Sequence, residues 1–228
     1  MIRPILVLAG FAAAVSLGGC VSLLPKAKPS QLYSFADTAV VAPTGVPTGP
    51  ASSIVLGAMT FPRAATSDAL LTRTGAEAAY IAEARWTAPA AVLFREATER
   101  AFDNSGKVRI LSRGELGTAA GILRVEVRAF ETRYPAPEAV PTVAVIFHAR
   151  LNRVDGNFVA ERDFAAETPA SENRVGPIVG AYRTSTAKSL GELVGWLETN
   201  APAQPAVVRS SVTTQSTSTT STTTLAPR

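Results

Sequence analysis

The chain has 228 residues, a formal net charge of +4 at pH 7, and hydrophobic and charged shares of 46% and 18%. It contains one cysteine and one histidine. These counts exclude an internal disulfide and a zinc site of the usual cysteine and histidine type, and we expect no metal or cofactor. No run rich in lysine and arginine with interleaved aromatic residues occurs, so we expect no nucleic acid partner.

The first twenty residues have the order of a bacterial lipoprotein signal. Arg3 supplies a positive charge, and residues 5–15 form an apolar stretch that is short for a membrane span. The stretch ends in Leu17-Gly18-Gly19-Cys20, where two small residues precede a thiol that can accept a diacylglycerol. Several acyl chains, palmitate among them, anchor a protein stably because each buried methylene contributes about 0.8 kcal/mol. We predict a signal peptide over 1–19 and a tether over 20–30 that is lipidated at Cys20.

The residue after the cysteine bears on location. Position 21 is Val, whereas Asp at this position tends to retain lipoproteins in the inner membrane of enteric-type bacteria. Val21 therefore favours the outer membrane, with the domain on its periplasmic face, and the inner membrane is the less favoured alternative.

The other end of the chain has low complexity. From Ser210 to Thr224, only Val212 and Gln215 are neither serine nor threonine. Such a segment cannot bury enough apolar area to offset its conformational entropy. We predict a disordered tail over 201–228 and a single folded domain over 31–200, which is long enough for one core.

The first half of this domain predicts short elements. Residues 41–53 are expected to form a linker or long loop, and 66–77 either a mobile loop or a short helix. A helix over 90–102 is expected to begin after an N-cap at Thr87. In chain order, the predicted strands here are 32–35, 53–61, 79–86 and 108–111.

The second half predicts a sheet with one solvated face. Strands over 122–130, 142–153 and 157–166 are expected to form an antiparallel meander, with Asp155-Gly156 as a hairpin turn. A last helix from about 177 to 199 follows, with an apolar stripe. The expected fold class is α+β, an α/β sandwich in which two main helices pack on one face of an antiparallel sheet.

An ordered set of segments resembles the ABC-type transport auxiliary lipoproteins, the family that includes the paraquat-inducible protein C lipoproteins. The lipobox is followed by a Tyr-x-Phe strand at Tyr33, by Arg73-Thr74-Gly75, and by a strand that ends in Arg85-Trp86. The helix at 90–102, the strand at Leu123 and the last helix complete the order. The resemblance covers residues 31–199, and its strength lies in the order rather than in any one motif.

The resemblance implies a periplasmic subunit that is not an enzyme. It implies action beside an ABC transporter, with its permease and ATPase, that moves lipid between the inner and outer membranes. It further implies a partner of the mammalian-cell-entry (MCE) domain type. The Ser/Thr-rich tail is not part of the family pattern.

Several other residues with aromatic, charged or imidazole side chains could belong to a site, but most are expected to have structural roles. Arg85 and Trp86, and Tyr182 and Trp196 on the last helix, are candidate partner or lipid contacts, although the three aromatic residues are better explained as core. His148 is expected to be a satisfied core or edge histidine. The acidic residues of one strand are expected to form a solvated or salt-bridged face with Arg150, Arg153 or Arg162; they are Glu161, Asp163 and Glu167.

Two alternatives from other classes remain open at this point. One is a stand-alone envelope lipoprotein that binds peptidoglycan or a glycan through its tail and polar face. The other is a lipoprotein hydrolase, which is disfavoured because the chain has one histidine and no Gly-x-Ser-x-Gly motif.

Overall fold

The computed structural model describes residues 29–37, 51–103, 105–111 and 119–204. The predicted signal peptide, Cys20 and the Ser/Thr-rich segment therefore lie outside the described residues, as does most of the predicted linker over 41–53. In chain order the elements are β1 (Gln31–Tyr33), β2 (Ser52–Thr60), η1 (Arg63–Ala65), β3 (Ala69–Thr74), β4 (Glu77–Trp86), α2 (Ala90–Ala101), β5 (Val108–Leu111), β6 (Gly121–Tyr134), β7 (Thr142–Arg153), β8 (Phe158–Pro169) and α3 (Val175–Asn200).

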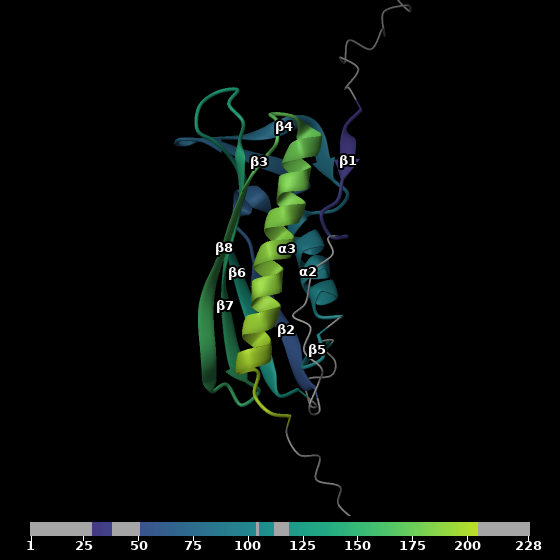
Figure 1. Cartoon of the computed structure of the whole chain (residues 1–228), viewed down its shortest axis with the longest axis vertical. Coiled ribbons are helices and arrows are strands. Elements are labelled where there is room, and N and C mark those ends of the chain that lie inside the picture. Colours follow the sequence, from purple (N-terminus) through teal and green to yellow (C-terminus); the bar gives the residue numbers. More distant parts are fainter. Residues whose placement is uncertain (1–28, 38–50, 104, 112–118, 205–228) are drawn as a thin grey trace, which may run out of the picture.

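The long strand β6 organises the sheet, because two strands share one of its edges. β2 pairs with residues 121–126 and β3 with residues 132–134, both in parallel, while β7 pairs antiparallel along the opposite edge. The sheet therefore forks at β6 into one branch through β2 and β5 and another through β3, β4 and β1. Figure 1 shows β6, β7 and β8 along the length of the molecule and the β3–β4 hairpin across its upper end.

The predicted meander is confirmed as β6, β7 and β8. The prediction of an antiparallel sheet is wrong, because four strand pairs are parallel. They are β1–β4, β2–β5, β2–β6 and β3–β6. Hydrophobic alternation reports which face of a strand is buried and carries no information about its neighbour in space. The class α+β and the single domain hold, with a mixed sheet in place of an antiparallel one.

The expected loop or short helix over 66–77 is also wrong. This segment contains β3, whose first three residues are all buried, so that it lacks the alternation of a half-exposed strand. A two-residue turn, Gly75-Ala76, then leads into β4, and Gly75 has the positive φ of 56° that such hairpin turns require. Glycine suits this turn because it adopts a positive φ without steric cost.

The N-cap residue of α2 differs from the predicted one. Thr87 does not cap the helix, whose N-cap residue is Pro89 and makes no side-chain cap hydrogen bond. The N–H of Ala90 instead donates to the backbone oxygen of Ser67 at 3.0 Å. A distant loop thus satisfies one of the donors that a helix leaves unpaired at its first turn.

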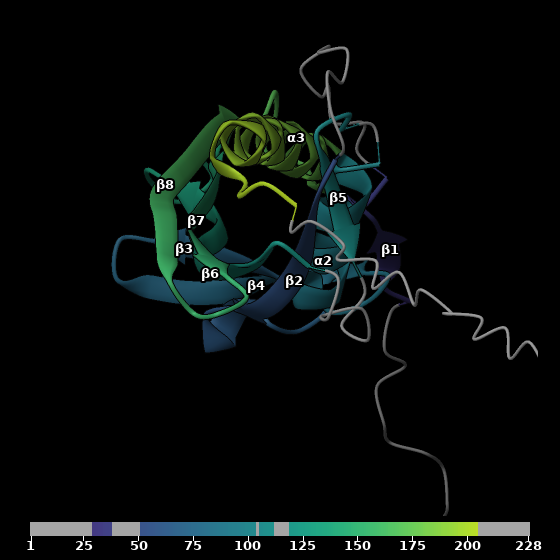
Figure 2. The ribbon, with the colours of Figure 1, turned by 90° about the horizontal axis from the view of Figure 1, so that it is seen from below.

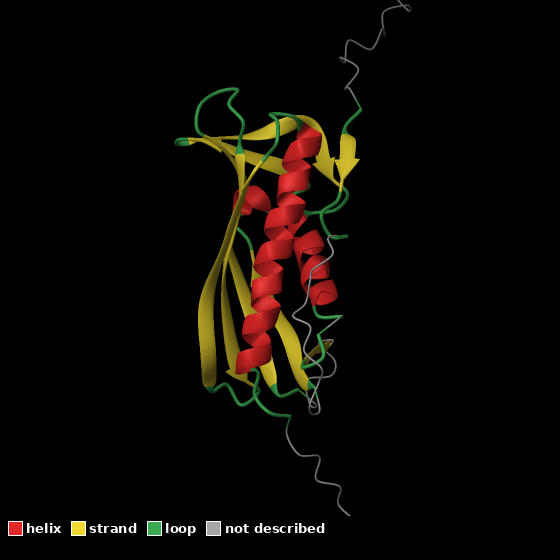
Figure 3. Cartoon of the chain, viewed as in Figure 1, coloured by secondary structure: helices red, strands yellow, loops and turns green. Residues whose placement is uncertain are grey.

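The core is a cluster to which β1–β8 and both main helices contribute. At its centre the ring centroids of Trp86 and Tyr182 lie 5.1 Å apart, and those of Phe130 and Tyr182 lie 4.9 Å apart. α3 packs mainly against β7 and β8 and runs beside them along the curved wall of strands (Figure 2). Figure 3 shows how much longer α3 is than α2. That both helices share one face of the sheet stays a prediction.

A bulge in β6 turns Phe130 into this core. The register of β6 against β7 shifts between Val127 and Ala129. Before the shift the odd-numbered residues from Leu123 to Val127 face the core, and after it Phe130 and Thr132 are buried. One extra residue reverses the alternation, because side chains in a strand point to opposite faces with a period of two.

The predicted boundary of the tail at residue 201 is set too early. The hydroxyl of Ser52 donates to the backbone oxygen of Pro202 at 2.7 Å, and the N–H of Ser53 donates to the side-chain oxygen of Gln204 at 2.9 Å. Residues 201–204 therefore belong to the fold, because they provide the polar partners at the start of β2.

Candidate functional site

The solvated face of the meander carries two rows of polar side chains. Register places Arg124 of β6 opposite Arg150 of β7, which in turn lies opposite Glu161 of β8. The neighbouring row runs from Thr60 of β2 through Glu126 and His148 to Asp163. The sequence predicts this wet face for β6, and the strand pairing brings the residues of four strands together.

His148 lies on this face and not in the core. Its Nδ1 is 2.8 Å from Oδ1 of Asp163 and its Nε2 is 3.7 Å from Oε2 of Glu161. The expected satisfied histidine is confirmed, but it lies neither in the core nor at an edge, because Phe147 and Ala149 take the inward positions and β7 pairs with both β6 and β8. The imidazole is held by acidic side chains of β8, and no described nucleophile contacts it.

The expected salt-bridged face of β8 is confirmed, although two of its three arginine partners come from β6. Arg150 Nη1 is 3.9 Å from Glu161, as the sequence suggested. Arg128 Nη1 lies 2.9 Å from Oδ1 of Asp163, and Arg133 Nη1 lies 2.6 Å from Oε1 of Glu167. Exposed pairs of this kind contribute about 0–1 kcal/mol each, so they set geometry more than stability.

A groove of about 370 Å³ opens over this face between β2 and β7. Its lining residues are Ala58, Thr60, Arg124, Val125, Glu126, Arg128, His148 and Arg150. The hollow follows from size, because the two β2 residues are small whereas the arginines of β6 and β7 are long. Charged side chains therefore surround a space that is large enough for a small ligand.

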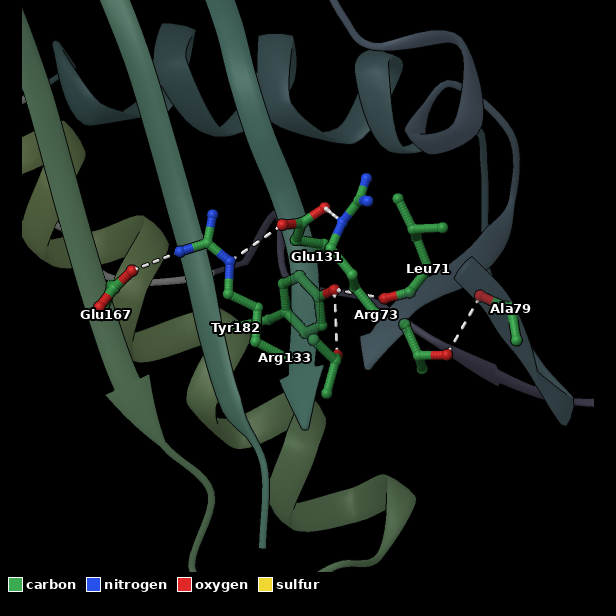
Figure 4. A network of polar contacts seen from close by, with 9 residues as sticks. Leu71, Arg73, Ala79, Glu131, Arg133, Glu167 and Tyr182 are labelled. Carbon is green, nitrogen blue, oxygen red and sulfur yellow. Dashed lines mark hydrogen bonds and ion pairs between the residues drawn. The ribbon is translucent and has the colours of Figure 1, made fainter. Parts of the chain in front are cut away.

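A second polar network lies near the turn of the β3–β4 hairpin, where β3 pairs with the end of β6 (Figure 4). The Glu131 carboxylate accepts hydrogen bonds from Nε of Arg73 at 3.2 Å and from Nε of Arg133 at 2.9 Å. The Glu131 side chain is 9% exposed, whereas the two arginines are 43% and 39% exposed. Two guanidinium groups thus compensate one buried charge, and the network ties β3 to β6 and, through Glu167, to β8.

Beside this network Tyr182 is fully buried. The hydroxyl of Thr132 donates to its phenolic oxygen at 3.2 Å, and Tyr182 makes a longer contact of 3.5 Å to the backbone oxygen of Leu71. Burial raises the pKa of Tyr182, and the hydrogen bond from Thr132 opposes this shift. Burial also raises the pKa of the Tyr134 phenol. Both phenols keep their protons at neutral pH, so they form hydrogen bonds as neutral groups.

The structure places the candidate contact residues in two different settings. Arg85 is exposed and its Nη1 lies 3.3 Å from Oδ1 of Asp68. Trp86, Tyr182 and Trp196 are buried, which is the core position that the sequence favoured for them. Cys20 lies outside the described residues.

Within the described residues, no three histidine, cysteine, aspartate or glutamate side chains are arranged to hold a metal ion. Among the helices of the same ranges, none combines the length and the apolar character that crossing a bilayer demands. The sequence pattern did not reveal the groove or the Glu131 network, because both depend on the pairing of distant strands.

The comparison with family models identifies the family of the chain. The model of the ABC-type transport auxiliary lipoprotein component matches residues 33–193. This range spans the described fold from β1 to the last turns of α3. A comparison with curated proteins finds no match.

Solved structures share the fold. The crystal structure of protein XCC0632 from Xanthomonas campestris is similar with a TM-score of 0.67 and 24% identity, over 75% of this chain and 95% of that chain. An uncharacterised protein is similar with a TM-score of 0.59 and 13% identity, over 75% of this chain and 99% of that chain. At these identities the similarity concerns the fold alone.

Proposed function

The chain belongs to the family of ABC-type transport auxiliary lipoprotein components, and from this premise we propose that it is a membrane-anchored periplasmic lipoprotein and a non-catalytic subunit of an ABC-type system for lipid transport between the inner and outer membranes. The observation that carries the proposal is the family match over residues 33–193, which covers nearly the whole folded domain. The lipobox that ends at Cys20 supports the anchor.

The proposed mechanism is positional. Acyl chains on Cys20 hold the domain at the outer membrane, and a surface of the domain docks an MCE-domain partner of the permease and ATPase. The tether of residues 20–30 spans at most roughly 36 Å when fully extended. β1 begins directly after it, at the end of the molecule that carries the β3–β4 hairpin (Figure 1). The docking surface is therefore proposed to work close to the bilayer.

Substitution of the anchor residue tests the first half of the proposal. Cys20→Ser replaces the thiol by a hydroxyl that does not accept the diacylglycerol, so we expect loss of labelling by an alkyne-bearing palmitate and release of the protein by osmotic shock. The control is Ser22→Ala, which leaves the thiol in place and is expected to stay membrane-bound. Equal labelling of the wild type and Cys20→Ser would contradict the anchor.

Location and partner need separate measurements. We expect the wild type in the outer-membrane fraction of a sucrose gradient, and Val21→Asp in the inner-membrane fraction. Crosslinking in cells from a photoreactive residue at exposed Arg85, in parallel with one at exposed Arg183, is expected to capture an MCE-domain protein from at least one position. Capture of cell-wall material alone from both positions would favour an envelope lipoprotein that binds peptidoglycan.

A further inference from the structure

Two arginines face each other on the solvated side of the sheet. Arg124 of β6 and Arg150 of β7 are direct partners in the antiparallel register. Like charges directly opposite on one face destabilise a strand pair. Among the described residues, no carboxylate lies within ion-pair distance of Arg124, whose Nη1 contacts only Oδ1 of Asn152 at 3.4 Å. The arrangement has a cost that the described contacts do not offset.

Arg150 is only partly compensated. Its Nη1 lies 3.9 Å from Glu161, at the limit of an ion pair, and its guanidinium carbon lies 5.2 Å from the centre of the Phe158 ring. Its side chain is 52% exposed. Stacking on an aromatic ring fixes the plane of a guanidinium without using its in-plane N–H donors. Both arginines therefore keep donors available on the groove side.

The next row of the groove has the opposite charge. Glu126 follows Arg124 on the same face, at a spacing of two residues or roughly 6.8 Å along the strand. Among the described residues it forms no ion pair, because its cross-strand neighbour His148 is bonded to Asp163. Asp163 is in turn bonded to Arg128. Arg128 and His148 of the lining are thus both engaged by Asp163, and the groove presents two less compensated guanidinium groups and, one step along, one carboxylate without an ion pair in the described part of the chain.

We propose that this groove binds a ligand in which a phosphate group neighbours an ammonium group, with the phosphate between Arg124 and Arg150 and the ammonium against Glu126. Guanidinium groups form paired, charge-assisted hydrogen bonds with phosphate oxygens. Glu126 disfavours a simple anion and favours a zwitterion. The chemistry is that of phosphoethanolamine, either as a free small molecule or as a lipid headgroup. The inference stands on the groove alone and does not rest on the proposed transport function.

Calorimetric titration of the full chain in maltoside micelles, which contain no phosphate, tests the proposal. We expect glycerophosphoethanolamine to bind more tightly than glycerol phosphate, which lacks the amine. Arg124→Gln is expected to weaken glycerophosphoethanolamine about tenfold, the equivalent of one charge-assisted contact. Glu126→Gln is expected to remove the preference for the amine-bearing ligand. Arg183→Gln, an exposed arginine of α3 outside the groove, is the matched control and is expected to bind like the wild type.

The two sources of the ligand are distinguished by a second titration with phosphatidylethanolamine in the same micelles. Binding of the lipid that Arg124→Gln weakens assigns the site to a headgroup, whereas binding of the soluble compound alone assigns it to a free molecule. Circular dichroism checks the fold of each variant, and Arg150→Gln replaces Arg124→Gln if the latter unfolds. Absence of binding by both ligands, or equal binding by the wild type and the Arg124 and Arg150 variants, overturns the proposal.

Discussion

At the scale of single residues, Glu131 is the one charged residue that is buried within the described part of the chain. Its carboxylate is nearly buried and receives one hydrogen bond on each oxygen, from Arg73 and from Arg133. A buried charge needs a partner, because removing it from water costs several kcal/mol. Glu131 has two partners, so one arginine still compensates its charge when the other is removed.

This redundancy predicts a non-additive result. Arg73→Ala and Arg133→Ala are each expected to lower the free energy of unfolding by about 1 kcal/mol, because Glu131 keeps one partner. The double variant leaves a buried carboxylate without a cation and is expected to lose about 3 kcal/mol or more. Urea unfolding of the four proteins measures the coupling, and strictly additive losses would contradict the shared role.

Tyr182 predicts a dependence on alkaline pH. Burial raises the pKa of its phenol above the ordinary value, so the folded protein favours the protonated form. The corresponding stability is present below the unfolded pKa of about 10 and is lost as the pH rises towards the folded pKa. We expect Tyr182→Phe to lose less of its stability between about pH 10 and 11.5 than the wild type does. Denaturant unfolding over this range measures it, with Tyr33→Phe as the control, and equal losses would refute it.

The residues of the groove show what sequence can and cannot predict about a site. Alternation in β6 predicts that Arg124, Glu126 and Arg128 lie on the wet face, and they do. Arg124 lies opposite Arg150 because of the register between β6 and β7. The sequence pattern of a single strand does not determine this register. The charges were therefore predictable, and their juxtaposition was not.

At the scale of elements, regular periodicity predicted most of the secondary structure. The two main helices and the β6–β8 meander lie close to where their apolar patterns predicted them. β3 was not predicted, because its residues Ala69–Leu71 are all buried and do not alternate between apolar and polar. Such a run fits a strand, a loop or a helix end equally well. The bulge of β6 ended the predicted strand at residue 130, whereas the strand continues to Tyr134.

The glycines of two elements predict opposite effects of the same substitution. Gly180 lies in α3, and a β-carbon added there meets no atom within 4 Å. Gly180→Ala is expected to raise the stability by about 0.5–1 kcal/mol, because alanine loses less backbone entropy in a helix. A β-carbon on Gly121 of β6 would lie 2.8 Å from the backbone oxygen of Asn152. Gly121→Ala is therefore expected to destabilise the protein, and thermal melts of both variants check the two signs.

At the scale of the whole molecule, one core joins the forked sheet to the helices. Phe35, just after β1, packs edge-on against Trp86 at a centroid distance of 5.0 Å and lies 4.9 Å from Phe130. The segment that follows the tether is therefore a structural part of the domain. Because strands of both branches and both main helices contribute to this cluster, we expect a single cooperative unfolding transition.

Phe35→Ala tests this cooperativity. Loss of a fully buried phenylalanine is expected to cost about 3–5 kcal/mol. Because the core is shared, we expect the far-ultraviolet and near-ultraviolet circular dichroism signals to shift together to a lower melting temperature. A variant whose aromatic signal melts before its backbone signal would show that the N-terminal segment is a separate unit.

The fork at β6 also affects how the domain folds. Ile54 pairs with Gly121 and Thr72 with Thr132. Both β2 and β3 therefore pair with a strand, β6, that lies much later in the chain. Such long-range pairing slows folding, because large loops must close before contacts form. A chain that emerges from its N-terminus therefore exposes the apolar β2 until β6 is available, and aggregation is most favoured during this interval.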